Sequence, residues 1–518
     1  MNRSKSVSVL CFSLLCSLQS WAGLLDDIQK GLDQVNKDRN QANESVKTPI
    51  KTKNTSKDKS TPQNIYYAGY SETLKPIKDL YLTGNLDGIE RFFGERESKQ
   101  LDGVSIWESI EKVGLLRWME RGTLYLDQGN PDYAIQSLAN AEQVIELRYY
   151  DSKLKDTFST GFFSLLETIT GMEEFTNYPG EGFEKVLMLN FKSISYLLNG
   201  DRRAYNVTRR AIDWQDIEKR KFDAELRAAE DKLNQEKSKD KETQSDIAWG
   251  DSYGKYDKIA SRVASAYVNP FGYYVAGMVQ DFESRLEPSL RSNAKISYKK
   301  ALELNPDSKA LQKALSDIDD KNLDAGVRVL HLVVGNGFVP EKKVLEYQVN
   351  SHGRVVPIKL PIYAPVPSKV ARIEVRSMSG KTIATLSQIA DIEAITLRHQ
   401  KDSAAFRNLR VLLSVARAVG VNSMTKSVPI LGQWINEFAA PDTRSWMSLP
   451  AEILGARIRL RKDVGQLRLV TFDKNNKVLA NQVINLDTKS DNFVYARTID
   501  THIYPNSSKT LWTFNHEN

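Results

Sequence analysis

Cysteine is almost absent from this 518-residue sequence, whose only two cysteines are Cys11 and Cys16. Both lie in an apolar stretch near the N-terminus, so the chain after Ala22 carries no thiol. This scarcity excludes a disulfide framework, a cysteine nucleophile and a thiolate metal site from everything downstream. The downstream chain must instead be held together by apolar packing and non-covalent polar contacts.

Long hydrophobic runs are lacking as well. The most apolar stretch, residues 7–18, is too short to cross a bilayer. It follows the basic residues Arg3 and Lys5, and Ser20 and Ala22 place small side chains at the positions that signal peptidase recognises. We therefore predict a secretory signal peptide over residues 1–22, cleaved after Ala22.

Lipid anchoring of the exported chain is the less favoured alternative. A bacterial lipoprotein carries a small residue directly before its modified cysteine, whereas Leu10 and Leu15 precede the two cysteines here. We therefore expect a protein of the bacterial periplasm.

A strong excess of one charge is also missing. The formal net charge is +7, and acidic and basic residues alternate along most of the sequence. This pattern is typical of a solvated surface rather than of a nucleic-acid interface. We predict no nucleic-acid partner.

The familiar motifs of catalysis and metal binding do not occur. The segment Gly380-Lys381-Thr382 resembles the end of a phosphate-binding loop, but Val375 stands where that loop needs its first glycine. None of the five histidines has another histidine at ligand spacing, and there is no zinc-protease motif or serine nucleophile elbow. We therefore predict no catalytic residue, no metal ligand and no cofactor. Acidic residues that converge only in the folded chain are the alternative left open.

The clearest positive signal is a helix–turn–helix pattern over residues 118–141. Large and small side chains recur at helical spacings on both sides of the turn at Asn130-Pro131, as in a tetratricopeptide repeat (TPR). The small residues allow close helix packing, and the large ones fill the space between helices. The predicted framework residues are Trp118, Gly122, Tyr125, Ala134, Leu138 and Ala141.

A second unit of this kind covers residues 273–306. Its predicted framework residues are Gly277, Ala294, Tyr298, Ala301 and Pro306. Residues 185–213 match more weakly, because Lys192 stands where the first helix should have a glycine. Repeated helical pairs of this kind stack into a solenoid and usually serve as binding surfaces.

Beyond about residue 324 the apolar residues alternate with polar ones, which is typical of strands. In residues 456–461, for example, the aliphatic residues are expected to face the core and the arginines the solvent. The whole sequence predicts an α+β multidomain protein, with an N-terminal TPR-like α-solenoid followed by a β-sandwich-like domain with a helical insertion. The predicted parts are a signal peptide (1–22), a short helix and flexible linker (23–63), a helical domain (64–322) with a long charged helix near 212–245 that projects from the solenoid, and a β-rich domain (323–518) with the insertion near 389–440.

Two segments of the C-terminal half are candidates for recognition. In residues 442–453, Pro450 favours an extended loop in which Asp442, Arg444 and Trp446 could contact a partner. The alternative is a loop that closes an edge of the sandwich. The second segment is Phe406–Val419, whose basic helix could lie on anionic lipid. We expect it instead to pack on its own domain, so membrane contact is not predicted.

Three stretches together carry a resemblance to a family: NPFGYYVAGM at residues 269–278, YKKALELNPD at 298–307, and DTRSWMSLPAEI at 442–453. The chain resembles exported TPR-containing proteins of Gram-negative bacteria that have a β-rich C-terminal half, with DTRSW-x-x-LPAEI as the most specific motif. The resemblance implies no particular activity. It implies a partner in envelope assembly, since such proteins are associated with genes for small outer-membrane lipoproteins, including activators of cell-wall synthases. Many of these proteins are lipoproteins, from which this chain departs at Leu10 and Leu15.

The favoured function is a non-catalytic periplasmic scaffold that binds an envelope protein or peptide through its TPR-like surface, in cell-envelope or outer-membrane assembly. Two alternatives stay open. One is an enzyme acting on the cell wall or a glycan through the β-rich half, and the other is a structural subunit of an envelope complex. The identity of the partner and the oligomeric state do not follow from the sequence.

Overall fold

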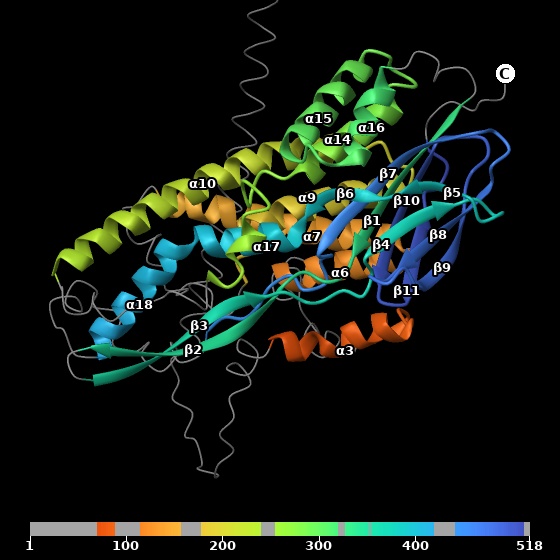
Figure 1. Cartoon of the computed structure of the whole chain (residues 1–518). Coiled ribbons are helices and arrows are strands. Elements are labelled where there is room, and N and C mark those ends of the chain that lie inside the picture. The colour runs from red at the N-terminus through yellow and green to blue at the C-terminus, as the bar shows by residue number, and fades with distance from the viewer. Residues whose placement is uncertain are drawn as a thin grey trace, which may run out of the picture. The chain divides into compact units, whose positions relative to one another are not determined.

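The computed structural model describes residues 70–88, 114–156, 178–239, 254–319, 327–351, 354–418 and 441–511. All of them belong to one compact unit, Pro62–Asn518 (Figure 1). The predicted signal peptide and the predicted helix and linker over residues 23–63 lie outside the described residues.

The first part of this unit is helical. Its helices are α3 (Tyr70–Thr83), α6 (Leu115–Asp127), α7 (Pro131–Asp156), α9 (Gly182–Leu198), α10 (Ala204–Lys239), α13 (Asp257–Ala260), α14 (Pro270–Glu283), α15 (Leu290–Leu304) and α16 (Lys309–Ile318). Three helical pairs, α6 with α7, α9 with α10 and α14 with α15, are each joined by a short turn and packed together. Successive pairs contact each other through α7 and α9 and through α10 and α14.

The second part contains the strands. They are β1 (Arg328–Asn336), β2 (Glu341–Ser351), β3 (Arg354–Ala364), β4 (Arg372–Arg376), β5 (Thr382–Thr385), β6 (Ser387–Asp391), β7 (Glu452–Leu460), β8 (Gln466–Phe472), β9 (Val478–Asn485), β10 (Asn492–Ile499) and β11 (His502–Ser507). The helices α17 (Ile392–Asp402) and α18 (Ala404–Ala418) separate β6 from β7. They fall within the predicted insertion, whose later residues, 419–440, lie outside the described part of the chain. The chain is therefore of mixed α+β class, with helices in its N-terminal half and sheets in its C-terminal half.

The strands form three sheets. The largest has the order β11-β10-β1-β7-β6 and is mixed, because β1 runs parallel to β10 and antiparallel to β7. A four-stranded antiparallel sheet has the order β5-β4-β8-β9, and among the described strands β2 pairs only with β3.

The five-stranded sheet has apolar contacts on both of its faces. On one face, Leu332 of β1 and Ile458 of β7 pack with Leu469 of the four-stranded sheet, so the two sheets share a core. On the other face, side chains such as Val333 and Tyr495 belong to a larger core that includes the three helical pairs. Successive side chains of a strand point to opposite faces of the sheet, so neighbouring residues belong to different cores. The helices therefore form a layer over the sheet, and the helical and β-rich parts share a core.

The long helix predicted near residues 212–245 is α10, which begins earlier, at Ala204. The expectation that it projects alone is wrong. Its Ala229 and Leu233 pack against Leu409 and Leu412 of α18 (Figure 1). The apolar residues on this side of α10 therefore have their partner within the same chain.

Helix α18 is covered on a second side. Its Val411 and Val415 pack with Val356, Ile358 and Leu360 of β3. The described apolar residues Leu409, Val411, Leu412 and Val415 of the segment Phe406–Val419 thus pack within the protein, as predicted. In the described part of the chain, no helix is both long and apolar enough to cross a membrane.

Candidate functional site

The close helix approach predicted at the two glycines is present. A Cβ atom at Gly122 would lie 2.2 Å from Leu138 Cδ2, and one at Gly277 would lie 2.5 Å from Tyr298 Cδ1. Neither distance is compatible with a side chain larger than hydrogen. Glycine at these positions lets the first helix of the pair lie directly against a large side chain of the second.

Most other predicted framework residues lie in the core between helices. Trp118 and Tyr125 are half-buried and pack against this core from α6. Pro306 is exposed and follows the end of α15, where a proline stops the helix. The fully buried members of the predicted set are Ala134, Leu138, Ala141, Ala294, Tyr298 and Ala301.

In the middle pair, α9 with α10, a charged residue stands in place of the glycine and forms an ion pair. Lys192 is buried on α9, and its Nζ lies 2.5 Å from Glu142 Oε2 of α7. Arg210 of α10 also binds this glutamate, at 2.7 Å. This contact was not predictable from local sequence patterns, because the three residues lie on three different helices.

The candidate recognition loop is buried. The Trp446 side chain has no exposed surface, and its ring packs against Phe191 at 6.0 Å between centroids. Its indole Nε1 donates to Thr123 Oγ1 and Ser448 Oγ, each at 3.2 Å. The expectation that Trp446 contacts a partner is therefore wrong in this structure. Its large apolar ring gains more from the core than from solvent.

The other two members of the loop bind each other. Arg444 is buried, and its Nη2 lies 2.8 Å from Asp442 Oδ2. Its guanidinium also lies over the Tyr178 ring, 5.5 Å from the centroid. Only Asp442, with 39% of its side chain exposed, reaches the surface. A structural loop, the alternative to recognition, describes these residues better, but it lies against α6 and α9 and not at an edge of the sandwich as predicted.

Two glutamates on first helices of the pairs hold the main chain of this loop. Glu184 Oε1 of α9 accepts from the Trp446 N–H at 2.9 Å. Glu120 of α6 accepts from the Met447 N–H at 2.7 Å and from the Ser448 N–H at 3.0 Å. Thr123 also hydrogen-bonds Ser448 through their hydroxyl groups. The backbone N–H groups of residues 446–448 are therefore bound by side chains of α6 and α9, and the chain makes a turn at Met447 and Ser448 instead of staying extended as predicted.

Burial changes the acidity of Glu120. Loss of hydration raises the pKa of its carboxyl to about 7, although the hydrogen bonds from Ser448 and Met447 and the charge of Lys78 act in the opposite direction. Burial also raises the pKa of Glu184, and the nearby Glu181 adds to the effect. Burial beneath the loop therefore disfavours the ionised form of both carboxyl groups.

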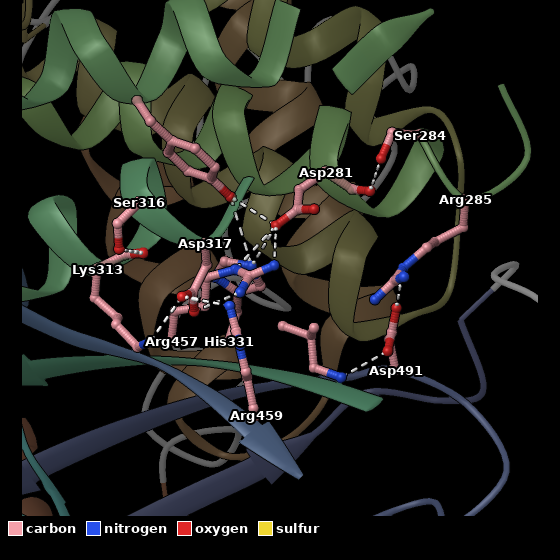
Figure 2. Close-up of polar contacts among 12 residues, drawn as sticks. Asp281, Ser284, Arg285, Lys313, Ser316, Asp317, His331, Arg457, Arg459 and Asp491 are labelled. Atoms are coloured by element: carbon pink, nitrogen blue, oxygen red, sulfur yellow. Dashed lines mark hydrogen bonds and ion pairs between the residues drawn. The ribbon is translucent and has the colours of Figure 1, made fainter. Parts of the chain in front are cut away.

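A second contact between helices and sheet is a buried charge cluster (Figure 2). Arg457 of β7 was expected to face the solvent, but it points into the helical layer. Its Nε lies 3.1 Å from Asp281 Oδ2 of α14, and its Nη1 lies 2.8 Å from Asp317 Oδ2 of α16. Arg459 also binds Asp317, at 2.9 Å. The prediction failed because α14 and α16 place their carboxylates against this face of the sheet at Arg457, and these carboxylates neutralise the arginine.

His331 of β1 completes this cluster. Its Nε2 lies 3.2 Å from Asp281 Oδ2, and its Nδ1 lies 3.2 Å from the Tyr274 hydroxyl. Burial lowers the pKa of His331, and Asp281 only partly opposes this. Burial also disfavours the charge on Asp281, but Arg457, His331 and Arg285 outweigh it, so the pKa of Asp281 lies below its usual range.

A third contact centres on Asp127 at the end of α6. It accepts from the Tyr81 hydroxyl at 2.7 Å and from the Tyr495 hydroxyl at 2.9 Å. The Arg497 side chain lies beside it, 3.8 Å from Nε to Asp127 Oδ2. This contact joins α3, α6 and β10.

In these three contacts, buried polar and charged side chains of the helices bind the sheet or the loop before β7. Asp281 and Asp317 both bind Arg457, and all three side chains are buried. No group of three or more His, Asp or Glu side chains that could hold a metal ion is found within the described residues.

Comparison of the chain with protein-family models, curated proteins and solved structures finds no match.

Proposed function

We propose that the protein is a non-catalytic scaffold of the bacterial periplasm that binds an envelope protein or peptide. In this proposal the three helical pairs are TPR-like units of a short α-solenoid, and the sandwich-like sheets brace that solenoid. The close approaches at Gly122 and Gly277 support this reading of the helical pairs.

The observation that carries the proposal is the binding of the segment 446–448 by Glu120 and Glu184. The first helices of two pairs hold a short segment by its main-chain N–H groups, which every non-proline residue of a peptide offers. The ligand in this case belongs to the same chain. The face of α6 and α9 that binds it is therefore already used, and an external partner needs another face.

Exposed apolar side chains on the second helices of the pairs mark that other face. Tyr133 of α7 is 51% exposed and Ile296 of α15 is 55% exposed. On α15, Ile296, Lys300 and Leu304 are spaced by four residues and lie on one side of the helix. Such a row suits an apolar segment that carries acidic residues.

Photo-crosslinking in cells tests the proposal. A crosslinking amino acid is placed at Tyr133 or at Ile296, with Met378 on the β4–β5 hairpin as a matched control, since it is also exposed. We expect one envelope protein to be captured at both helical positions and not at Met378. Glycan or lipid adducts at Met378, without protein capture at either helical position, would count against the scaffold.

A further inference from the structure

The outer edge of β2 pairs with no other strand in the part of the chain that the structure describes, although Lys78 of α3 forms an ion pair with Glu341 at its beginning. In β3, the backbone N–H of Tyr363 donates to the Gln400 side chain at 2.6 Å instead of to β2. Backbone groups alternate in direction along an antiparallel pair, so residues 357, 359 and 361 also face away from β2. The register pairs these residues with Gln348, Glu346 and Val344. Those three therefore direct their own N–H and C=O groups away from β3.

The two outer edges of this pair differ. The edge of β3 carries Pro357 and Pro361, which have no N–H group and so prevent the addition of a strand. The edge of β2 carries no proline. Within the described residues, the outward backbone groups of Val344, Glu346 and Gln348 have no hydrogen-bond partner. One edge is thus protected and the other is left available.

The remaining edges of the described sheets are protected in other ways. β5 has only four residues and is bulged against β4. β6 is also bulged, and its Gln388 carbonyl accepts from the Asn305 side chain. β11 contains Pro505, and β9 is approached by β11, where Ser507 Oγ donates to the Asn485 carbonyl. Natural sheets use these devices to avoid edge-to-edge pairing. β2, with 11 residues, has none of them.

We propose that β2 pairs with β2 of a second copy of this chain, antiparallel, about a two-fold axis at Leu345. Leu345 lies opposite Leu360, and it ends the apolar row that packs on α18. Its half-buried side chain would meet the Leu345 side chain of the copy and continue the row across both molecules.

The charges of β2 fit this register. A two-fold axis at Leu345 places Lys342 opposite Gln348 and Val344 opposite Glu346, so no two like charges face each other. The result is a four-stranded sheet with the order β3-β2-β2-β3 and a self-complementary interface, as a symmetric dimer requires. This proposal does not depend on the scaffold function.

Sedimentation velocity of the purified protein provides the first test, with Val344→Pro and Lys359→Pro as a matched pair. Each substitution removes one outward N–H, on β2 or on β3, and leaves the hydrogen bonds between the two strands intact. We expect a dimer whose dissociation constant rises by about tenfold or more in Val344→Pro, since two intermolecular hydrogen bonds are lost, and stays unchanged in Lys359→Pro. A monomer at high concentration, or a dimer that Val344→Pro leaves intact, would overturn the proposal.

Disulfide trapping tests the register. Cys11 and Cys16 are first changed to serine, and then Leu345→Cys and Glu346→Cys are compared under mild oxidation. At Leu345 the two new thiols would face each other across the axis, within reach of a disulfide. At Glu346 they would be offset along the strands. Rapid covalent dimer formation in Leu345→Cys alone supports the register, and equal formation in both variants, or in neither, contradicts it. Thermal melts of both variants show whether the fold is kept.

Discussion

Asp281 and Arg457, 176 residues apart in the chain, form an ion pair that both the helical layer and the sheet bury, with 3.1 Å between Asp281 Oδ2 and Arg457 Nε. The same guanidinium binds Asp317. A residue that was expected to face the solvent instead joins the β-rich half to the helices.

Replacement of Arg457 should therefore destabilise the protein strongly. Arg457→Leu leaves the carboxylates of Asp281 and Asp317 buried without their main counter-charge, and we expect a loss of about 3–5 kcal/mol in the free energy of unfolding. Urea unfolding measures it. Arg461→Leu is the control, because Arg461 pairs only at the surface, with 81% of its side chain exposed. That change should cost about 0.5 kcal/mol or less. Equal losses in the two variants would contradict the buried role of Arg457.

The close packing at Gly122 predicts a context-dependent effect. Gly122→Ala places a methyl group against Leu138, and we expect a loss of about 1–3 kcal/mol in stability. Gly254→Ala is the control, since a Cβ there meets nothing within 4 Å. In the double variant Gly122→Ala with Leu138→Ala the new methyl group has room. Its loss should thus be smaller than the sum of the two single losses, which a double-mutant cycle measures.

The raised pKa of Glu120 predicts a dependence of stability on pH. The carboxyl keeps its proton in the folded state up to about pH 7, whereas the unfolded chain releases it near its ordinary value of 4.5. This contribution is therefore fully favourable below about pH 4.5, declines as the pH rises and is lost above about pH 7. A shift of this size corresponds to roughly 3 kcal/mol.

Comparison with Glu120→Gln isolates that contribution, because other groups titrate in the same range. The amide has no charge, so the difference in unfolding free energy between wild type and variant should change by up to about 3 kcal/mol between pH 4.5 and 7.5. Wild type should lose stability relative to the variant as the pH rises. A difference that does not vary with pH would show that Glu120 keeps an ordinary pKa.

Trp446 separates the two interpretations of its loop. Trp446→Ala should cost about 3–5 kcal/mol in stability, as is typical for a large buried aromatic side chain. Thermal and urea unfolding measure this loss. Val355→Ala, at a side chain that is 59% exposed, is the control and should have little effect. A recognition loop would show the opposite behaviour, with normal stability and loss of crosslinked partner.

The sequence predicted what depends on local spacing. The glycines at 122 and 277, the buried alanines and the end of α15 near Pro306 all follow from the periodicity of single helices, because each is decided by residues a few positions away. The change from helices to strands between α16 and β1 was predictable for the same reason.

Contacts between distant segments were not predictable. Whether Arg457 or Trp446 faces solvent depends on which element covers β7 and the loop before it. The sequence of the strand itself does not indicate which element that is. The carboxylates that receive Arg457 lie on α14 and α16, and those that hold the Trp446 loop lie on α6 and α9. In sequence these acidic residues look like any others on the polar side of a helix.

The hydrogen bond between Glu120 and Met447 also has a consequence for biogenesis, since the two residues are 327 positions apart. Synthesis at about 5–20 residues per second leaves α6 complete for roughly 15–65 s before Met447 exists. During that interval Glu120 and the apolar face around it lack their covering segment. The nascent helical part therefore leaves this surface uncovered until Met447 has been synthesised.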